Sequence, residues 1–313
     1  MIETINLTKK YGNLTALNNL NMTIEQGDCF GFIGPNGAGK TTTIKILATL
    51  LKPTWGEARI DGRVVGYQNR EIRPTIGYVP DFMGAYDDMV VDEYLEFFAA
   101  AYNIHGSQRR QVVNDVLELT DLAYKRDAEV NGLSRGMQQR LSIARVLLHD
   151  PKVLLMDEPA SGLDPRARIE IRELLKELRR MGKTILISSH ILHELSALCN
   201  TVGIIERGEL VYQGSVKQIM AHVGSGRIIH VCVEANVPSA CEFLSTLAGV
   251  DNVNLREADG ENVIDLTLSA NGSLSLSDIP SRLIAEGYRV TRFDEEQVNL
   301  ETAFMRLTEG LVQ

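Results

Sequence analysis

The chain has 313 residues, of which 44% are hydrophobic and 23% charged, and its formal net charge is -9. This length suggests two domains, with cores large enough to need no disulfide or metal staples. The acidic balance argues against general affinity for nucleic-acid phosphates, so we expect no nucleic-acid partner.

The four cysteines lack C-x-x-C spacing, which favours reduced thiols over a zinc or redox site. The N-terminus shows no signal-peptide pattern, and apolar runs such as residues 153–156 fall far short of the roughly 18 residues that a membrane helix needs. We therefore expect a cytoplasmic protein that acts at a membrane only through a partner.

The first part of the chain alternates strand and helix patterns. Strands are predicted within 1–25, 29–33, 153–156, 184–188 and 202–205, and a hairpin at 55–65. Helices are predicted at 41–51, across 88–149, at 169–180 and at 192–198. Because apolar strands alternate with helices, the main sheet should be largely parallel and covered on both faces.

A glycine-containing stretch at 222–226 is the best candidate for a domain boundary. We expect a first domain at 1–222, with a helical subdomain at about 82–150, and a second at 223–313 with an accessory or regulatory role. Its expected elements lie at 228–233, 239–247, 253–257, 263–268, 279–286 and 289–293, with a closing helix at 300–307. The order β-α-β-β-α-β is that of a small, ferredoxin-like α+β domain.

Residues 34–41 fit the phosphate-binding pattern G-x-x-x-x-G-K-[ST]. Glycines allow backbone N–H groups to surround phosphates, and the following helix points its positive end at them. Lys40 should reach the β- and γ-phosphates of ATP, and the Thr41 hydroxyl should ligate Mg²⁺. The expected nucleotide-binding residues here are Gly34, Pro35, Asn36, Gly37, Ala38, Gly39, Lys40, Thr41 and Thr42.

Two acids, Asp157 and Glu158, follow the apolar run at 153–156. Asp157 is placed to hold Mg²⁺, directly or through water. Glu158 projects differently and is a candidate base for an attacking water, so Lys40 and Glu158 are expected catalytic residues.

Together these motifs resemble the ATP-binding subunit of an ABC transporter, over residues 1 to about 220. The resemblance implies an α/β P-loop NTPase cassette with an antiparallel β subdomain and a helical subdomain. Tyr11 matches an aromatic residue that stacks on adenine. His190 matches a catalytic histidine that contacts the γ-phosphate.

Residues 133–137, Leu-Ser-Arg-Gly-Met, resemble the family's signature sequence, and Asp164 matches the acid of the loop that faces a second cassette. The resemblance implies a head-to-tail pair, most simply a homodimer, with each ATP between Lys40 of one chain and Ser134 and Gly136 of the other. Such a subunit binds the inner face of the membrane and drives export through a separate transmembrane permease.

The chain departs from the family pattern at two places. Asp81 replaces the usual glutamine after residues 76–80 and still offers an oxygen to Mg²⁺. Arg135 and Met137 alter the signature, and the arginine brings a cation near a polyanion. These changes either tune turnover or mark a slower, regulatory ATPase. A soluble ABC-type ATPase that acts on nucleic acid or ribosomes is a further alternative.

Overall fold

The structure is a computed structural model that describes residues 1–82, 84, 88–189, 195, 198–216, 218–219, 227–258, 261–269 and 274–295. The chain forms two compact units, Met1–Val216 (unit 1) and Lys217–Gln313 (unit 2). The boundary expected at residues 222–223 lies outside the described residues, and so do most of the helix expected at 192–198 and all of the helix expected at 300–307.

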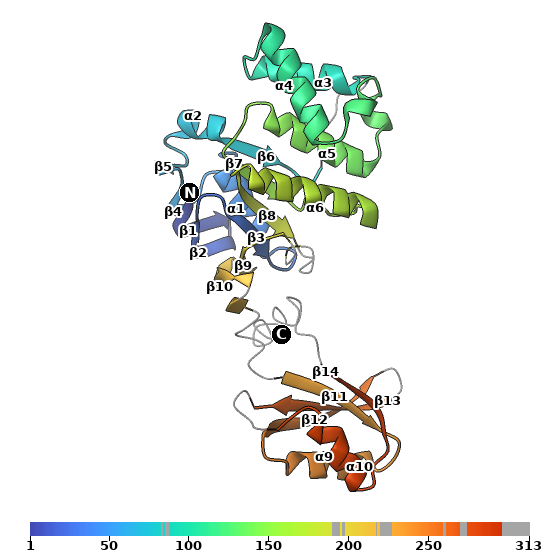
Figure 1. Cartoon of the computed structure of the whole chain (residues 1–313). Helices are drawn as coiled ribbons and strands as arrows, with labels where there is room; N and C mark the ends of the chain where they lie inside the picture. Colours follow the sequence, from blue (N-terminus) through green and yellow to red (C-terminus); the bar gives the residue numbers. More distant parts are fainter. Residues whose placement is uncertain are drawn as a thin grey trace. The chain divides into compact units, whose positions relative to one another are not determined.

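Unit 1 is built on a six-stranded sheet of order β10-β9-β3-β8-β7-β6 (Figure 1). All neighbouring pairs are parallel except β9 and β10. Every residue of β3, β7 and β8 is buried, as expected for parallel strands covered on both faces. The strands are β3 (Cys29–Ile33), β6 (Ile76–Val79), β7 (Val153–Asp157), β8 (Thr184–Ser189), β9 (Thr201–Glu206) and β10 (Glu209–Ser215).

A second, antiparallel sheet of order β2-β1-β4-β5 also belongs to unit 1. Its strands are β1 (Ile2–Tyr11), β2 (Leu14–Ile24), β4 (Trp55–Ile60) and β5 (Arg63–Val64). Asp61 and Gly62 have φ values of 51° and 75°, which suit the two-residue turn of a hairpin and confirm the pair expected at 55–65. A buried cluster that includes Leu20, Phe30 and Ile44 joins this sheet to the main sheet and to the first helix.

Six helices of unit 1 have their bounds described, and α3, α4 and α5 gather at one end of the unit (Figure 1). They are α1 (Lys40–Leu47), α2 (Asn69–Ile72), α3 (Val91–Ala101), α4 (Gly106–Leu119), α5 (Arg135–Leu147) and α6 (Pro165–Arg180). Short 3-10 helices occupy Arg73–Thr75, Ala123–Lys125 and Val130–Gly132. Among the described residues, no helix combines the length and the apolar character needed to cross a membrane.

Three local differences from the sequence expectation have physical causes. The first helix ends at Leu47 rather than at 51, because Thr49 adopts a left-handed φ of 62°. Helix α6 begins at Pro165 rather than at 169, since Asp164 caps it and proline suits a first turn. Strand β10 was not predicted; it is an antiparallel edge strand with a weak, partly exposed pattern.

Unit 2 has the expected element order β11-α9-β12-β13-α10-β14. Its sheet has the order β12-β13-β11-β14, with all three described pairs antiparallel. A separate core of Ile229, Leu244, Ile264 and other apolar residues lies between this sheet and its helices. The elements are β11 (Arg227–Val233), α9 (Val237–Ser245), β12 (Val250–Ala258), β13 (Glu261–Leu268), α10 (Asp278–Ala285) and β14 (Val290–Glu295).

Candidate nucleotide site

The loop between β3 and α1 needs glycine at two positions for packing reasons. A Cβ on Gly34 would lie 2.3 Å from the Ile205 carbonyl oxygen, and one on Gly39 would lie 2.6 Å from Leu17 Cδ2. Gly39 also has a φ of 111°, which is costly for residues with a side chain. The loop can therefore approach β2 and β9 closely while its backbone turns into the first residue of α1.

Lys40, the first residue of α1, is buried with its charged end among oxygen atoms. Its Nζ donates to the carbonyl oxygens of Gly34 at 2.7 Å and Pro35 at 3.1 Å. The same ammonium lies 3.5 Å from Glu158 Oε1. A buried cation held by neutral carbonyls and one carboxylate is well placed for an incoming polyanion.

Thr41 and Asp157 converge beside Lys40. The Thr41 hydroxyl donates to Asp157 Oδ1 at 3.0 Å, and the Ser188 hydroxyl donates to the same oxygen at 2.8 Å. The carboxylate is buried at the end of β7, where β8 places Ser188 directly opposite it. Hydroxyl and carboxylate oxygens are ligands that Mg²⁺ accepts.

Glu158 follows β7 in a left-handed conformation, with φ of 49°. Such a backbone costs on the order of 1 kcal/mol for a non-glycine residue and persists where neighbours impose it. Its N–H donates to Ser188 Oγ at 2.9 Å, which helps hold that conformation. One serine, which was not among the predicted site residues, therefore positions both acids.

Six of the nine expected nucleotide-loop residues line one pocket. Asn36, Gly37, Gly39, Lys40, Thr41 and Thr42 contribute from the loop and α1, with Ala16 from β2 and Glu158 from the end of β7. The pocket thus brings the predicted base and the predicted phosphate-binding lysine to the same space.

Tyr11, the residue predicted to stack on adenine, ends β1 and is 47% exposed. Lys9 Nζ lies 5.1 Å from the centre of its ring, a cation–π contact. An exposed aromatic face suits stacking, and the adenine role stays a prediction. His190, the predicted γ-phosphate contact, lies outside the described residues.

The signature residues and the loop after β7 meet where α5 and α6 begin. Ser134 caps α5 and accepts a hydrogen bond from the Met137 N–H at 3.3 Å, while Asp164 caps α6 through the Ala167 N–H at 2.9 Å. A Cβ on Gly136 would lie 2.6 Å from Ala167 Cβ, so only glycine permits this approach. The predicted roles of these residues toward a second chain's ATP stay predictions.

Asp81 lies beyond the end of β6, and its Oδ1 is 3.9 Å from Arg135 Nη2. The pKa of Tyr78, on β6, is raised by burial and further by the negative charges of Asp157 and Asp81. Both acids therefore act electrostatically on one ring. A metal role for Asp81 stays a prediction.

Comparison with known proteins agrees with this geometry. A family model described as "ABC transporter" matches residues 17–161. The chain is 34% identical over 302 residues to the Nod factor export ATP-binding protein I of Ralstonia nicotianae, covering 96% of this chain and 92% of the relative. It is 30% identical over 308 residues to the linearmycin resistance ATP-binding protein LnrL of Bacillus subtilis, covering 98% of both.

Solved structures give the same answer for unit 1. A dimeric ATP-binding cassette in a post-hydrolysis state, bound to ADP and Pi, is similar with a TM-score of 0.62 and 30% identity, over 69% of this chain and 98% of that chain. The phosphate loop and Glu158 share one pocket, and Thr41 is hydrogen-bonded to Asp157. Together with the family match and the relatives, this shows that the chain belongs to the ABC transporter family and is an ATP-hydrolysing, ATP-binding subunit of such a transporter.

Proposed function

We propose that this chain powers export through a separate transmembrane permease, at the cytoplasmic face of the membrane, as one half of a homodimer. The proposed direction of transport rests on the names of two relatives that align along almost the whole chain. One is a Nod factor export protein and the other a linearmycin resistance protein. We also propose that unit 2 has an accessory or regulatory role in this subunit.

The observation that carries the catalytic part is the convergence of Lys40, Thr41, Asp157 and Glu158 at the end of β7. Thr41 and Asp157 fit a magnesium ion, since their oxygens already lie 3.0 Å apart. When bound there, Mg²⁺ neutralises charge on the β- and γ-phosphates.

Glu158 acts as the base once ATP has arrived. The phosphates draw Lys40 toward themselves, and Glu158 then loses its cationic partner. Its carboxylate takes a proton from a water whose oxygen bonds to the γ-phosphorus, while the bond to the ADP oxygen breaks and that oxygen keeps the electron pair. His190 is proposed to contact the γ-phosphate.

A second copy completes the nucleotide site. Ser134 and the Gly136 N–H begin α5, and a helix N-terminus attracts phosphate through its free N–H groups and its dipole. We assign them to the ATP held by the partner's phosphate loop, with Asp164 at the same interface. The dimeric architecture of a related cassette supports this arrangement.

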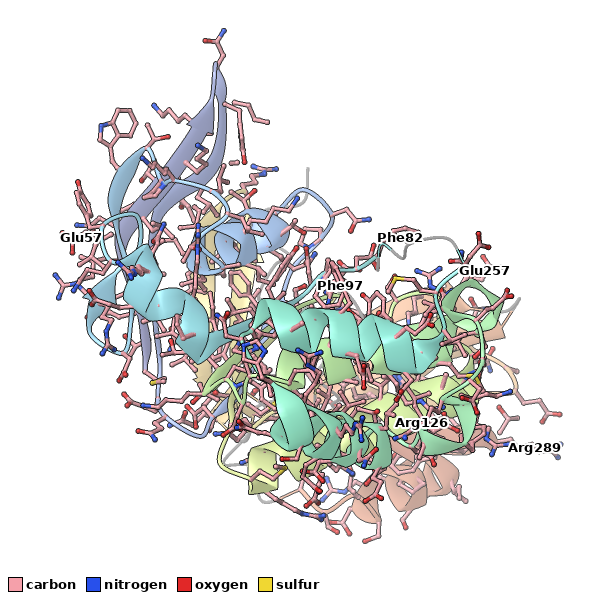
Figure 2. The ribbon with its side chains drawn as sticks, turned by 90° about the horizontal axis from the view of Figure 1, so that it is seen from above. Glu57, Phe82, Phe97, Arg126, Glu257 and Arg289 are labelled. Atoms are coloured by element: carbon pink, nitrogen blue, oxygen red, sulfur yellow. The ribbon has the colours of Figure 1, made fainter. Side chains whose placement is uncertain are left out.

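The permease is proposed to dock beside α3. Phe82 and Phe97 are 80% and 49% exposed, and Figure 2 shows Phe97 on α3 and Phe82 on the segment after β6. Burying these two aromatic side chains in a partner would be favourable, so they suit a docking surface beside α3.

The test measures Mg²⁺-dependent ATP hydrolysis by the purified chain over a range of its own concentrations, beside Glu158→Gln. We expect the rate per chain to rise with concentration, and the variant to bind ATP but turn over about 10²–10⁴-fold more slowly while accumulating as an ATP-bound dimer. Glu173→Gln, on the exposed face of α6, is the matched control. A rate per chain that stays constant, from a protein that stays monomeric with ATP, overturns the homodimer.

A further inference from the structure

The two departures from the family pattern meet in the folded chain. Asp81 follows β6 and Arg135 begins α5, yet their charged groups approach to 3.9 Å. The side chains are 56% and 57% exposed, so the pair lies in contact with water. The two departures therefore place a cation and an anion beside each other.

Gly162, in the loop between β7 and α6, provides the space that Arg135 occupies. A Cβ at this glycine would lie 2.4 Å from Arg135 Nη1 and 2.6 Å from Cζ. The guanidinium group therefore rests against the backbone of that loop. Gly162 has a φ of 66°, so an alanine there would meet both backbone strain and the guanidinium.

Arg135 thus contacts two loops from the first turn of its own helix. One loop follows β6 and carries Asp81; the other follows Glu158 and ends at Asp164, the cap of α6. The close approach of Gly136 to Ala167 fixes the adjacent helix ends. Because the guanidinium of Arg135 contacts both loops, a movement of either loop relative to α5 would change one of these contacts.

The pair also changes the charge presented beside the nucleotide. Alone, Asp81 would add an unbalanced negative charge on the segment after β6. Alone, Arg135 would add an unbalanced cation beside Ser134. Paired, their opposite charges balance each other.

We propose that Asp81 and Arg135 form a single positioning unit, with Arg135 held between the Asp81 carboxylate and Gly162, that sets the N-terminus of α5 relative to the loop after Glu158. The inference rests on the proposed function, since that helix end and that loop face the partner's nucleotide in the dimer. Neither residue needs to contact the reacting atoms.

The test compares the full chain with Asp81→Asn, Arg135→Gln and the double variant. Each single variant leaves one unbalanced charge, and half-exposed pairs contribute about 0.2–1 kcal/mol, so we expect kcat to fall about 1.4- to fivefold. The double variant should lose no more than one single variant does. The melting temperature should stay unchanged in all three variants.

Two further measurements distinguish a positioning role of this pair from a general effect on the stability of the fold. Raising the salt concentration screens half-exposed charges, so the kcat gap between the parent chain and each single variant should narrow. Gly162→Ala should cost less kcat in the Arg135→Gln background than in the parent chain, because the displaced guanidinium is gone.

The matched control is the pair Glu57 and Arg59 on β4, with side chains 46% and 40% exposed (Figure 2 labels Glu57). Glu57→Gln, Arg59→Gln and their double variant should leave kcat at the parent value. The proposal is overturned if the losses from Asp81→Asn and Arg135→Gln multiply in the double variant, or if neither change lowers kcat. That outcome is distinct from failure of the homodimer, which appears in the parent chain as a rate per chain independent of concentration.

Discussion

The ammonium of Lys40 lies 3.5 Å from the carboxylate of Glu158, so the phosphate-binding cation and the proposed base are partners in the structure. Both side chains are largely buried, which strengthens their interaction relative to one in water. The arrangement couples the two proposed roles, because phosphate that attracts Lys40 also weakens the ion pair between Lys40 and Glu158.

Replacement of Lys40 by alanine is expected to weaken ATP binding by about 100-fold, since hydrogen bonds to charged groups contribute about 1.5–3 kcal/mol each. Hydrolysis should fall at least as far, because no ammonium group would hold the β- and γ-phosphates. Binding of a fluorescent ATP analogue and steady-state hydrolysis measure the two effects. Lys45→Ala, an exposed lysine of the same helix, is the control, and an unchanged ATP affinity in Lys40→Ala would contradict the site.

Replacement of Ser188 by alanine is expected to lower turnover about 10- to 100-fold, as is typical when a residue that orients a metal ligand is lost. Its hydroxyl donates to Asp157 and accepts from the Glu158 N–H, so both acids lose a fixed neighbour. The Mg²⁺ concentration for half-maximal activity should rise as well. Ser142→Ala, which removes a buried hydroxyl of α5 without a hydrogen-bond partner among the described residues, should change neither quantity.

The phosphate loop was predictable from sequence because its residues are neighbours in the chain. Gly34, Gly39 and Lys40 act through local backbone geometry, and that geometry is encoded by residue type and spacing. The main sheet was also predictable, since β3, β7 and β8 are continuous buried apolar runs.

The contributions of Ser188 and Arg135 depend on contacts that spacing does not reveal. Ser188 faces Asp157 only because β7 and β8 pair in one particular register. Two buried serines at the end of an apolar strand were the available signal, since polar side chains at the carboxyl ends of parallel strands gather at one edge. The approach of Arg135 to Asp81 and Gly162 required the packing of three segments to be known.

The proposed docking surface beside α3 predicts a change in membrane association. Phe82→Asp combined with Phe97→Asp should leave ATP hydrolysis by the isolated chain unchanged. In the source cell, the same variant should shift from washed membranes to the soluble fraction, because two charges replace apolar contacts with the permease. Tyr67→Asp, an aromatic residue 90% exposed between β5 and α2, is the control. Retention of the double variant on membranes at the parent level would argue against this surface.

Protonation of His149 is expected to destabilise the cassette as the pH falls. Burial lowers the pKa of His149, although its Nε2–H donates to the Ile76 carbonyl at 2.9 Å. Its ring stacks on Tyr102 with centres 4.2 Å apart, and its buried Nδ1 has no hydrogen-bond partner among the described residues. A second proton on the ring would therefore be unsatisfied in the folded state.

The direction of this pH effect follows from the linkage between proton binding and folding. Because the native pKa lies below the ordinary value of 6.5, the unfolded chain takes up the proton first, and stability is lost as the pH falls through about 6.5. We expect His149→Gln, which retains a donor for Ile76, to lose less melting temperature between about pH 7.5 and pH 5.5 than the parent chain does. His105→Gln, at an exposed position before α4, serves as the control. Parallel melting curves for the parent chain and His149→Gln across this range would show that burial of this ring does not govern the acid sensitivity.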